Sequence, residues 1–220
     1  MKIPLSSRLQ ACAAFVKKGD RIADIGCDHG YLSLYLLNSG LASFAVAADV
    51  NEMPLQSARL NAEKYGCCDK ISFHLSDGVQ NIPRDFDTMI CAGMGADTII
   101  SILTAAPWLK SDSYRLILQC QSKTPMLRKF LSDNGWYIVE EQVLRDGRFL
   151  YTVMNVHYDP ELSKLTDAQC HFPPALLVNP TNETQEYFNW IVNGLKIQAR
   201  HQNDPKIIAI LNDLTKENLP

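Results

Sequence analysis

The chain has 220 residues, of which 46% are apolar and 20% charged, a composition typical of a soluble globular protein with a full core. No apolar run approaches the roughly 20 residues that a membrane span needs, and the amino terminus opens no signal-peptide core, so we expect a cytoplasmic protein without a membrane segment. Seven cysteines, mostly in apolar runs and without a C-x-x-C pair, indicate reduced, buried thiols and argue against disulfides and metal.

The net charge of −3 is unevenly distributed along the chain. Residues 1–22 carry five Lys or Arg and one acid, and residues 110–150 carry seven against five, whereas residues 23–109 carry four against ten. Because phosphate contacts are local, such basic clusters matter more than the total charge. The clusters are compatible with a nucleic-acid partner and equally with an ordinary solvated surface.

Apolar residues at helical spacing predict a first helix from Leu5 to Val16, with Ser6 as a possible cap and a stop at Lys17-Lys18-Gly19. Since this helix precedes the first strand, it can pack beside a site at the end of that strand and hold Arg8 over it. The alternative is an ordinary surface arginine.

Residues 22–32 predict a buried strand, a tight turn and the start of a helix. Gly26 and Gly30 let a ligand approach the backbone, although glycines alone are a weak signal. Their order, Asp-x-Gly-x-x-x-Gly, differs from the nicotinamide fingerprint, and Asp28 inside the loop would repel a diphosphate. An acid-bordered turn suits a ligand with cationic centres, such as S-adenosylmethionine. An NAD-type site and a turn without any cofactor are the alternatives.

Two further strand ends are expected beside this turn. Residues 44–48 predict a strand that ends at Asp49, 25 residues after Asp24, where a carboxylate meets the ribose hydroxyls of a nucleotide-like cofactor. After a helix over residues 51–65, a third strand at 70–75 ends at Asp77-Gly78, beside the expected adenine.

The fourth strand, residues 86–92, is followed directly by Gly93-Met94-Gly95. Ligands of such sheets bind outside the carboxyl ends of the strands, and these glycines leave room for a flat ring. A plain strand-to-helix turn is the alternative. Residues 97–104 predict the next helix, residues 114–119 the fifth strand and residues 125–134 the helix after it.

Residues 136–144 and 148–156 predict two strands joined by Arg145-Asp146-Gly147, and Asp-Gly marks a hairpin turn. A parallel sheet that finishes in an antiparallel hairpin is the seven-stranded arrangement of many methyl-donor enzymes. We therefore divide the chain into a Rossmann-like domain, residues 1–158, and a helical part, residues 159–220.

In the helical part, prolines interrupt a connecting stretch before two helices, one from about residue 181 and one after Pro205. Facing apolar stripes predict that they form a helical hairpin. RNA contact and a packing or dimerisation role both remain open for its outer face, which carries Lys196, Arg200, His201 and Lys206.

With these motifs in view, the chain resembles the bacterial tRNA (adenine-22-N1)-methyltransferase family. The resemblance is close over residues 5–157 and less specific in Phe-Pro-Pro-x-Leu-Leu at 172–177 and the helical hairpin. The chain departs from the family pattern at two places. Ala96 stands where glycine is expected, and Cys120-Gln121, in the loop after the fifth strand, stands where Pro-Asn is expected. The resemblance rests on Leu5-Ser6-x-Arg8-Leu9, residues 24–32, Asp49-Val50-Asn51-Glu52, Gln56-Ser57-Ala58, Asp77-Gly78, Ala92-Gly93-Met94-Gly95 and residues 115–119.

The resemblance implies a class I, S-adenosylmethionine-dependent methyltransferase that modifies N1 of adenine 22 in the D-arm region of tRNA, with no metal and no stable protein partner. Adenine N1 has an in-plane lone pair and needs no strong base, but methylation makes the ring a cation that a nearby carboxylate would stabilise. Asp28 is the candidate catalytic residue. Its alternative roles are to cap the following helix or to bind the ammonium group of the donor.

The implied cofactor contacts are Asp24, Gly26, Cys27, His29, Gly30, Asp49, Val50, Asn51, Asp77, Gly78, Ala92, Gly93 and Met94. The implied substrate contacts are Arg8 and Gly95, with Lys17, Lys18, Arg128 and Lys129 as candidates for steering the tRNA. Two alternative functions stay open: a methyltransferase for a small metabolite, and a catalytically silent RNA-binding protein of the same fold.

Overall fold

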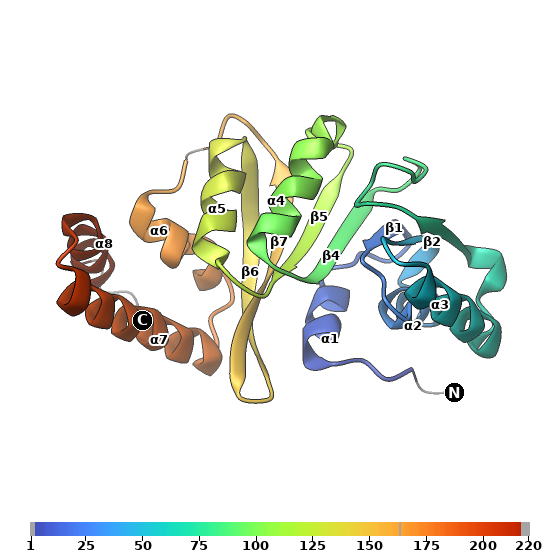
Figure 1. The fold of residues 1–220 in the computed structure, drawn as a ribbon, viewed down its shortest axis with the longest axis horizontal. Helices are drawn as coiled ribbons and strands as arrows, with labels where there is room; N and C mark the ends of the chain where they lie inside the picture. Colours follow the sequence, from blue (N-terminus) through green and yellow to red (C-terminus); the bar gives the residue numbers. More distant parts are fainter. Residues whose placement is uncertain (1–2, 163, 217–220) are drawn as a thin grey trace.

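The computed structural model describes residues 3–162 and 164–216 (Figure 1). Its centre is a seven-stranded sheet of order β3-β2-β1-β4-β5-β7-β6, in which the first five strands are parallel and β7 is antiparallel to both of its neighbours. The predicted sheet and its terminal hairpin are confirmed. The strands are β1 (Asp20–Ile25), β2 (Ala42–Asp49), β3 (Ile71–Leu75), β4 (Thr88–Met94), β5 (Arg115–Cys120), β6 (Trp136–Asp146) and β7 (Phe149–Tyr158).

Helices cover both faces of the sheet, which explains why its central strands are apolar on both sides. One core contains Ala23 and Ile25 of β1 with side chains of α4 and α5, and the other contains Ile22 with side chains of α1, α2 and α3. These helices are α1 (Ser7–Ala14), α2 (Tyr31–Asn38), α3 (Glu52–Tyr65), α4 (Ala96–Ala105) and α5 (Thr124–Asp133), with short 3₁₀ turns η1 (Cys68–Lys70) and η2 (Pro107–Leu109). The first helix is shorter than predicted, and Ser6 caps it by accepting a hydrogen bond from the Leu9 N–H.

The strand order reverses between β1 and β4. From β1 the chain moves outward to β2 and β3, and from β4 it moves to β5 on the other side. The loops that leave the carboxyl ends of β1 and β4 therefore diverge and leave a crevice, which is where ligands bind in open α/β sheets.

The chain after β7 returns to the sheet through α6 (Asp167–His171) and η3 (Pro174–Leu177), then forms α7 (Asn182–Gln202) and α8 (Pro205–Lys216). The predicted helical hairpin is confirmed, with Asn203 in a left-handed conformation at its turn. The hairpin is not isolated, because Tyr187 and Ile191 of α7 share a core with Val143 of β6. None of the helices described is long and apolar enough to cross a membrane.

Candidate cofactor and substrate site

A cavity of about 310 Å³ lies at the carboxyl ends of β1 and β4, in the crevice that the topology predicts. We call it the donor cavity. It brings together eight of the residues predicted from the sequence, Arg8, Asp24, Gly26, Cys27, Asp28, His29, Ala92 and Gly93, and adds Ser6, Leu9, Tyr31, Leu32 and Gln121.

The turn after β1 has the conformation that its glycines allow. Gly26 and Gly30 have φ of +73° and +74°, and the non-glycine Asp28 has φ of +52°. A Cβ on Gly26 would lie 2.3 Å from Met94 Cε, and a Cβ on Gly30 would lie 3.1 Å from Ala58 Cβ. The glycines therefore permit the turn itself and its close packing, while Met94 packs under the turn and does not line the cavity.

Asp24 is a buried carboxylate at the base of the cavity, 3% exposed. Burial raises the pKa of Asp24 to about 6, although hydrogen bonds from Ser33, including one of 2.7 Å from its hydroxyl, act in the opposite direction. No Lys or Arg in the described part of the chain forms an ion pair with Asp24. A desolvated carboxylate without a cationic neighbour fits the ammonium group of a ligand and repels a phosphate.

Asp49 orders the adjacent loop. Its two carboxylate oxygens accept backbone hydrogen bonds from Asp28 at 3.1 Å and Asn51 at 2.9 Å. Each oxygen keeps a second lone pair, so Asp49 can still accept hydrogen bonds from ribose hydroxyls. The Ser76 N–H donates to the Asp49 carbonyl at 2.9 Å, which brings the loop of Asp77 beside it.

Four more of the predicted cofactor contacts, Val50, Asn51, Asp77 and Gly78, follow β2 and β3 along the same edge of the sheet. Val50 is 63% exposed, which is unusual for an aliphatic side chain directly after a buried strand. An exposed apolar surface next to an acid fits one face of an adenine ring and its amine. An exposed apolar surface and carboxylates along one edge of the sheet suit an adenosine with a cationic end.

The predicted turn at Gly93-Met94 is the irregular end of β4, and it is held by a residue that we did not predict as part of the site. Gln119 is fully buried, its Oε1 accepts from the Gly93 N–H at 3.0 Å, and its amide donates to the Cys120 carbonyl at 3.2 Å. A polar side chain directly after the apolar run at residues 116–118 was the available signal for this role. Gly93 itself has φ of +83°, which favours glycine.

Arg8 lies over the cavity, as the position of the first helix predicted. Its Nε donates to Asp146 Oδ2 at 2.8 Å, one terminal nitrogen lies 3.5 Å from Gln119 Oε1, and its guanidinium carbon lies 5.4 Å from the centre of the Tyr151 ring. The side chain is still 27% exposed. Asp146 and Tyr151 are therefore further members of the site that sequence reasoning missed.

The β6–β7 hairpin reaches Arg8 because it extends past the carboxyl end of β5. Cys120, the last residue of β5, pairs with Thr152, so the hairpin residues before Thr152 continue beyond the sheet edge. Asp146 pairs with Phe149, so the turn consists of Gly147 and Arg148, one residue later than the Asp-Gly pair indicated.

Asp28 projects its carboxylate from the rim of the cavity, with a side chain 72% exposed. His29 Nε2 lies 3.6 Å from its Oδ1. The cap of α2 is Gly30, which has no side-chain partner, so the alternative that Asp28 caps this helix is wrong. The carboxylate remains available to a group that enters the cavity.

The structure contradicts the steering role predicted for Arg128. This side chain is fully buried, with its guanidinium paired with Glu141 at 2.7 Å and donating to the Cys170 and His171 carbonyls. It also donates to the Tyr187 hydroxyl at 3.3 Å. Arg128 therefore joins α5, β6 and α7 inside the protein and cannot meet a phosphate.

The other predicted basic residues are exposed but lie away from the donor cavity. Lys17 and Lys18 precede β1, at the amino ends of the strands and so at the edge of the sheet opposite the cavity. Lys129 lies 3.2 Å from Asp133 and 4.0 Å from Asp167, which partly neutralise it. None of the three lines the cavity.

Gly95 is a packing residue in this structure. A Cβ there would lie 2.9 Å from Ser122 Oγ, and the next residue, Ala96, donates its N–H to the Ser122 carbonyl at 3.1 Å. Both contacts fix the loop after β5 against the start of α4. From that loop, Gln121 reaches the donor cavity, in the position where the family resemblance led us to expect asparagine.

This sheet order, the acidic turn after β1 and the carboxylate at the end of β2 together define a Rossmann-like methyltransferase. The model of the methyltransferase domain family matches residues 5–154. The tRNA (adenine(22)-N(1))-methyltransferase of Bacillus subtilis is 33% identical over 154 residues, which cover 70% of this chain and 65% of that enzyme.

Solved structures agree over nearly the whole chain. The B. subtilis m1A22 tRNA methyltransferase TrmK superposes with a TM-score of 0.80 at 25% identity, covering 98% of this chain and 96% of that one. Mycoplasma capricolum TrmK, solved with S-adenosylhomocysteine, gives 0.79 at 25% identity, covering 96% and 95%. The chain belongs to the methyltransferase domain family and, within it, to the tRNA (adenine-22-N1)-methyltransferase family.

Proposed function

We propose that this protein transfers a methyl group from S-adenosylmethionine to N1 of adenine 22 in tRNA. The observation that carries the proposal is Asp24, a buried carboxylate without an ion-pair partner at the base of the donor cavity, whose rim residue Asp28 is hydrogen-bonded through its N–H to Asp49. Its charge favours a cationic methyl donor over a diphosphate-bearing coenzyme. The activity named for the B. subtilis relative supplies the target atom and base.

The donor, when bound, supplies a methyl group activated by a sulfonium. The chain would hold its ammonium end through Asp24 and its ribose through Asp49. The exposed Val50 would pack against the adenine, whose amine would face Asp77. These residues would orient the reactive end of the donor toward Gly93 and Arg8, at the cavity wall formed by β4 and α1.

The target adenine enters from the side of Arg8 and Gln121. Its N1 lies on the pairing edge, so the base must leave any pair or stack before it can react. Arg8, fixed by Asp146, is suited to hold the base or a neighbouring phosphate. As N1 gains the methyl group, positive charge develops on the ring, and the Asp28 carboxylate stabilises it.

The division at residue 158 is part of this proposal. Residues 1–158 would carry donor and chemistry, and residues 159–220 would contact the tRNA. Lys196 and Arg200 on α7 are exposed, whereas Lys206 of α8 lies 3.1 Å from Asp167. The two α7 residues are therefore the better candidates for phosphate contacts in the helical part.

The test is methyl transfer in solution. Purified protein with labelled S-adenosylmethionine should place label on an unmodified tRNA pool. Label on a small molecule alone would contradict the proposal and assign a metabolite as substrate. Binding of donor and tRNA without any transfer would instead indicate a silent RNA-binding protein.

Asp28→Asn should keep donor binding within about twofold and lower kcat for tRNA by about 10- to 100-fold, since an amide cannot neutralise the charge that develops on the ring. Calorimetric titration with the donor tests the binding prediction, and single-turnover rates with tRNA test the predicted loss of activity. Asp112→Asn, an exposed carboxylate in the loop before β5, is the matched control and should change neither. Full activity of Asp28→Asn would show that the carboxylate has no cation-stabilising role.

Arg8→Met should lower kcat/KM for tRNA by about tenfold, because one charge-assisted contact is lost, while the dissociation constant of the donor stays within about twofold. Arg21→Met is a matched control, because Arg21 pairs with Asp85 at the opposite edge of the sheet. A selective loss of donor affinity in Arg8→Met would place the arginine at the donor instead.

A further inference from the structure

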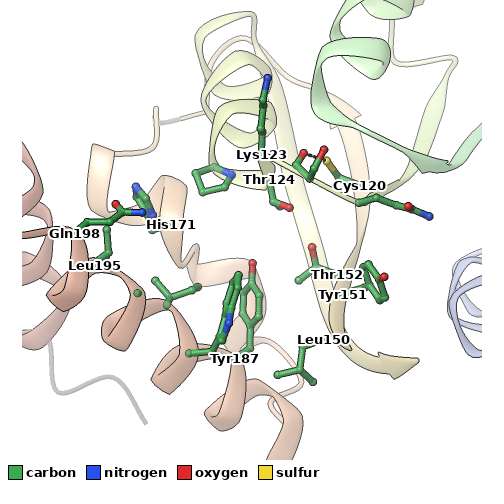
Figure 2. Close-up of a pocket in the computed structure, with 16 residues that line it drawn as sticks. Cys120, Lys123, Thr124, Leu150, Tyr151, Thr152, His171, Tyr187, Leu195 and Gln198 are labelled. Carbon is green, nitrogen blue, oxygen red and sulfur yellow. Dashed lines mark hydrogen bonds between the residues drawn. The ribbon is translucent and has the colours of Figure 1, made fainter. Parts of the chain in front are cut away.

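A second cavity, of about 340 Å³, lies between the loop after β5, strand β7 and helix α7 (Figure 2). We call it the interdomain groove. Gln121 lines both this groove and the donor cavity, and Tyr151, which lies beneath the Arg8 guanidinium, also lines it. The groove therefore begins where the target base is expected to enter.

One wall of the groove is an aromatic pair on α7. The rings of Tyr187 and Trp190 are stacked, with centroids 5.8 Å apart and planes 23° from parallel. Tyr187 is buried and its hydroxyl accepts from Arg128, so its ring is held in place, whereas Trp190 is 67% exposed. A large indole supported by a fixed ring and open to solvent is a platform on which another flat ring can stack.

The opposite wall contains a polar group without a protein partner. Thr152 of β7 is 2% exposed, and its Oγ1 has no hydrogen-bond partner within the described residues. Figure 2 shows Thr152 across the groove from Tyr187. A buried hydroxyl without a partner is costly, so a ligand that supplies a donor or acceptor here gains affinity.

The charges around the groove favour an uncharged occupant. Its lining includes no Asp or Glu, and its one lysine, Lys123, pairs with Asp97 at 2.8 Å. Burial, and then the nearby Arg128, lower the pKa of His171 below the usual histidine range, so this ring is neutral at pH 7. A phosphate would therefore find no free cation in the groove, while a nucleobase would find a stacking surface and a hydroxyl.

We propose that the interdomain groove holds an unstacked nucleobase of the substrate RNA, next to the target adenine, against Trp190 and within reach of Thr152. The inference rests on the proposed function. When the target base leaves its stack, its neighbour loses a stacking partner, and an aromatic side chain can replace it. The groove would then keep the RNA strand open during methyl transfer.

The test compares Trp190→Ala with Ile197→Ala, which removes another exposed apolar side chain of α7 outside the groove. Trp190→Ala should raise the KM for an unmodified tRNA transcript about tenfold, the usual size of one base–aromatic stack, and leave donor affinity unchanged. Ile197→Ala should leave both unchanged. Thr152→Val should raise the same KM severalfold, and Thr152→Ser should restore it.

Binding without turnover gives an independent readout. The chain has three tryptophans, so tRNA should quench part of the intrinsic fluorescence of the wild-type protein, and Trp190→Phe should remove that change while it keeps near-normal KM. Equal KM in Trp190→Ala and wild type would overturn the groove assignment and leave the methyltransferase proposal standing. A wild-type protein that transfers nothing to tRNA would overturn both.

Discussion

Replacing Arg128 by methionine is expected to lower the free energy of unfolding by about 3–5 kcal/mol, because the change leaves the Glu141 carboxylate buried without a partner. The carbonyls of Cys170 and His171 and the hydroxyl of Tyr187 lose their donor at the same time. In a chain of this length the loss corresponds to a decrease in melting temperature of about 10 °C. Urea unfolding and calorimetry measure both quantities.

The neighbouring Lys129 provides the matched control, because it lies on the same helix but is exposed. Lys129→Met removes only surface ion pairs and should cost less than about 1 kcal/mol. The double variant Arg128→Met with Glu141→Leu should recover much of the stability, since both members of the buried ion pair are then replaced by apolar side chains. A loss in Arg128→Met no greater than in Lys129→Met would contradict the assignment of Arg128 as an internal tie between α5, β6 and α7.

Asp24→Asn is expected to affect stability and donor binding in opposite directions. In the folded protein, burial raises the pKa of Asp24 to about 6, well above the ordinary value of 3.8. Between these values the folded state binds more protons than the unfolded state, so stability falls as the pH rises through this interval. The cost of burying the ionised carboxylate is complete above pH 6 and amounts to at most about 3 kcal/mol.

The asparagine variant should therefore be more stable than the wild type at pH 8, in the absence of donor, and about equal to it at pH 4. Its affinity for S-adenosylmethionine should fall by about one to two orders of magnitude, because the ammonium group loses its carboxylate. Thermal unfolding at the two pH values and calorimetric titration test the two effects separately. Unchanged donor affinity would contradict the placement of the ammonium group at Asp24.

The order of elements and the donor cavity could be predicted from the sequence, because both follow from local patterns. Apolar runs that end in acids and glycines locate the carboxyl ends of the strands, and parallel strands bring those ends to one edge. Asp24 and Asp28 therefore meet Gly93 although it lies more than sixty residues further along the chain. In the same way, the spacing of Asp49 after Asp24 predicted a carboxylate at the end of the second strand, on the same edge of the sheet.

The basic residues were harder to place, since charge is usually a sign of exposure. Arg128 lies with Leu127 and Leu131 on the buried face of α5. Its helical spacing from these leucines is therefore that of a core residue, whereas its charge led us to expect a side chain exposed to solvent. Its partner Glu141 lies after an irregularity between Ile138 and Glu140 that shifts the alternation of β6. Lys17 and Lys18 could have been assigned to the far edge, because residues before a strand lie opposite those that follow it.

The contacts of Arg8 depend on long-range pairing that no local pattern contains. Asp146 lies 138 residues away in the sequence and reaches Arg8 only because β7 pairs with β5 in a register that carries the hairpin past the sheet edge. Gln119 touches both Arg8 and the Gly93 N–H from a fully buried position. Tertiary structure thus fixes the side of the cavity where we propose that the substrate enters, whereas the side that we propose holds the donor is largely encoded in short motifs.

Nucleoside analysis of one tRNA transcript and its adenine 22→guanine variant, after incubation with this protein and S-adenosylmethionine, tests the assignment of adenine 22 as the target. That assignment predicts stoichiometric N1-methyladenosine in the first transcript and none in the second. Equal methylation of both transcripts, or a methyl group at another atom of the adenine, would contradict it.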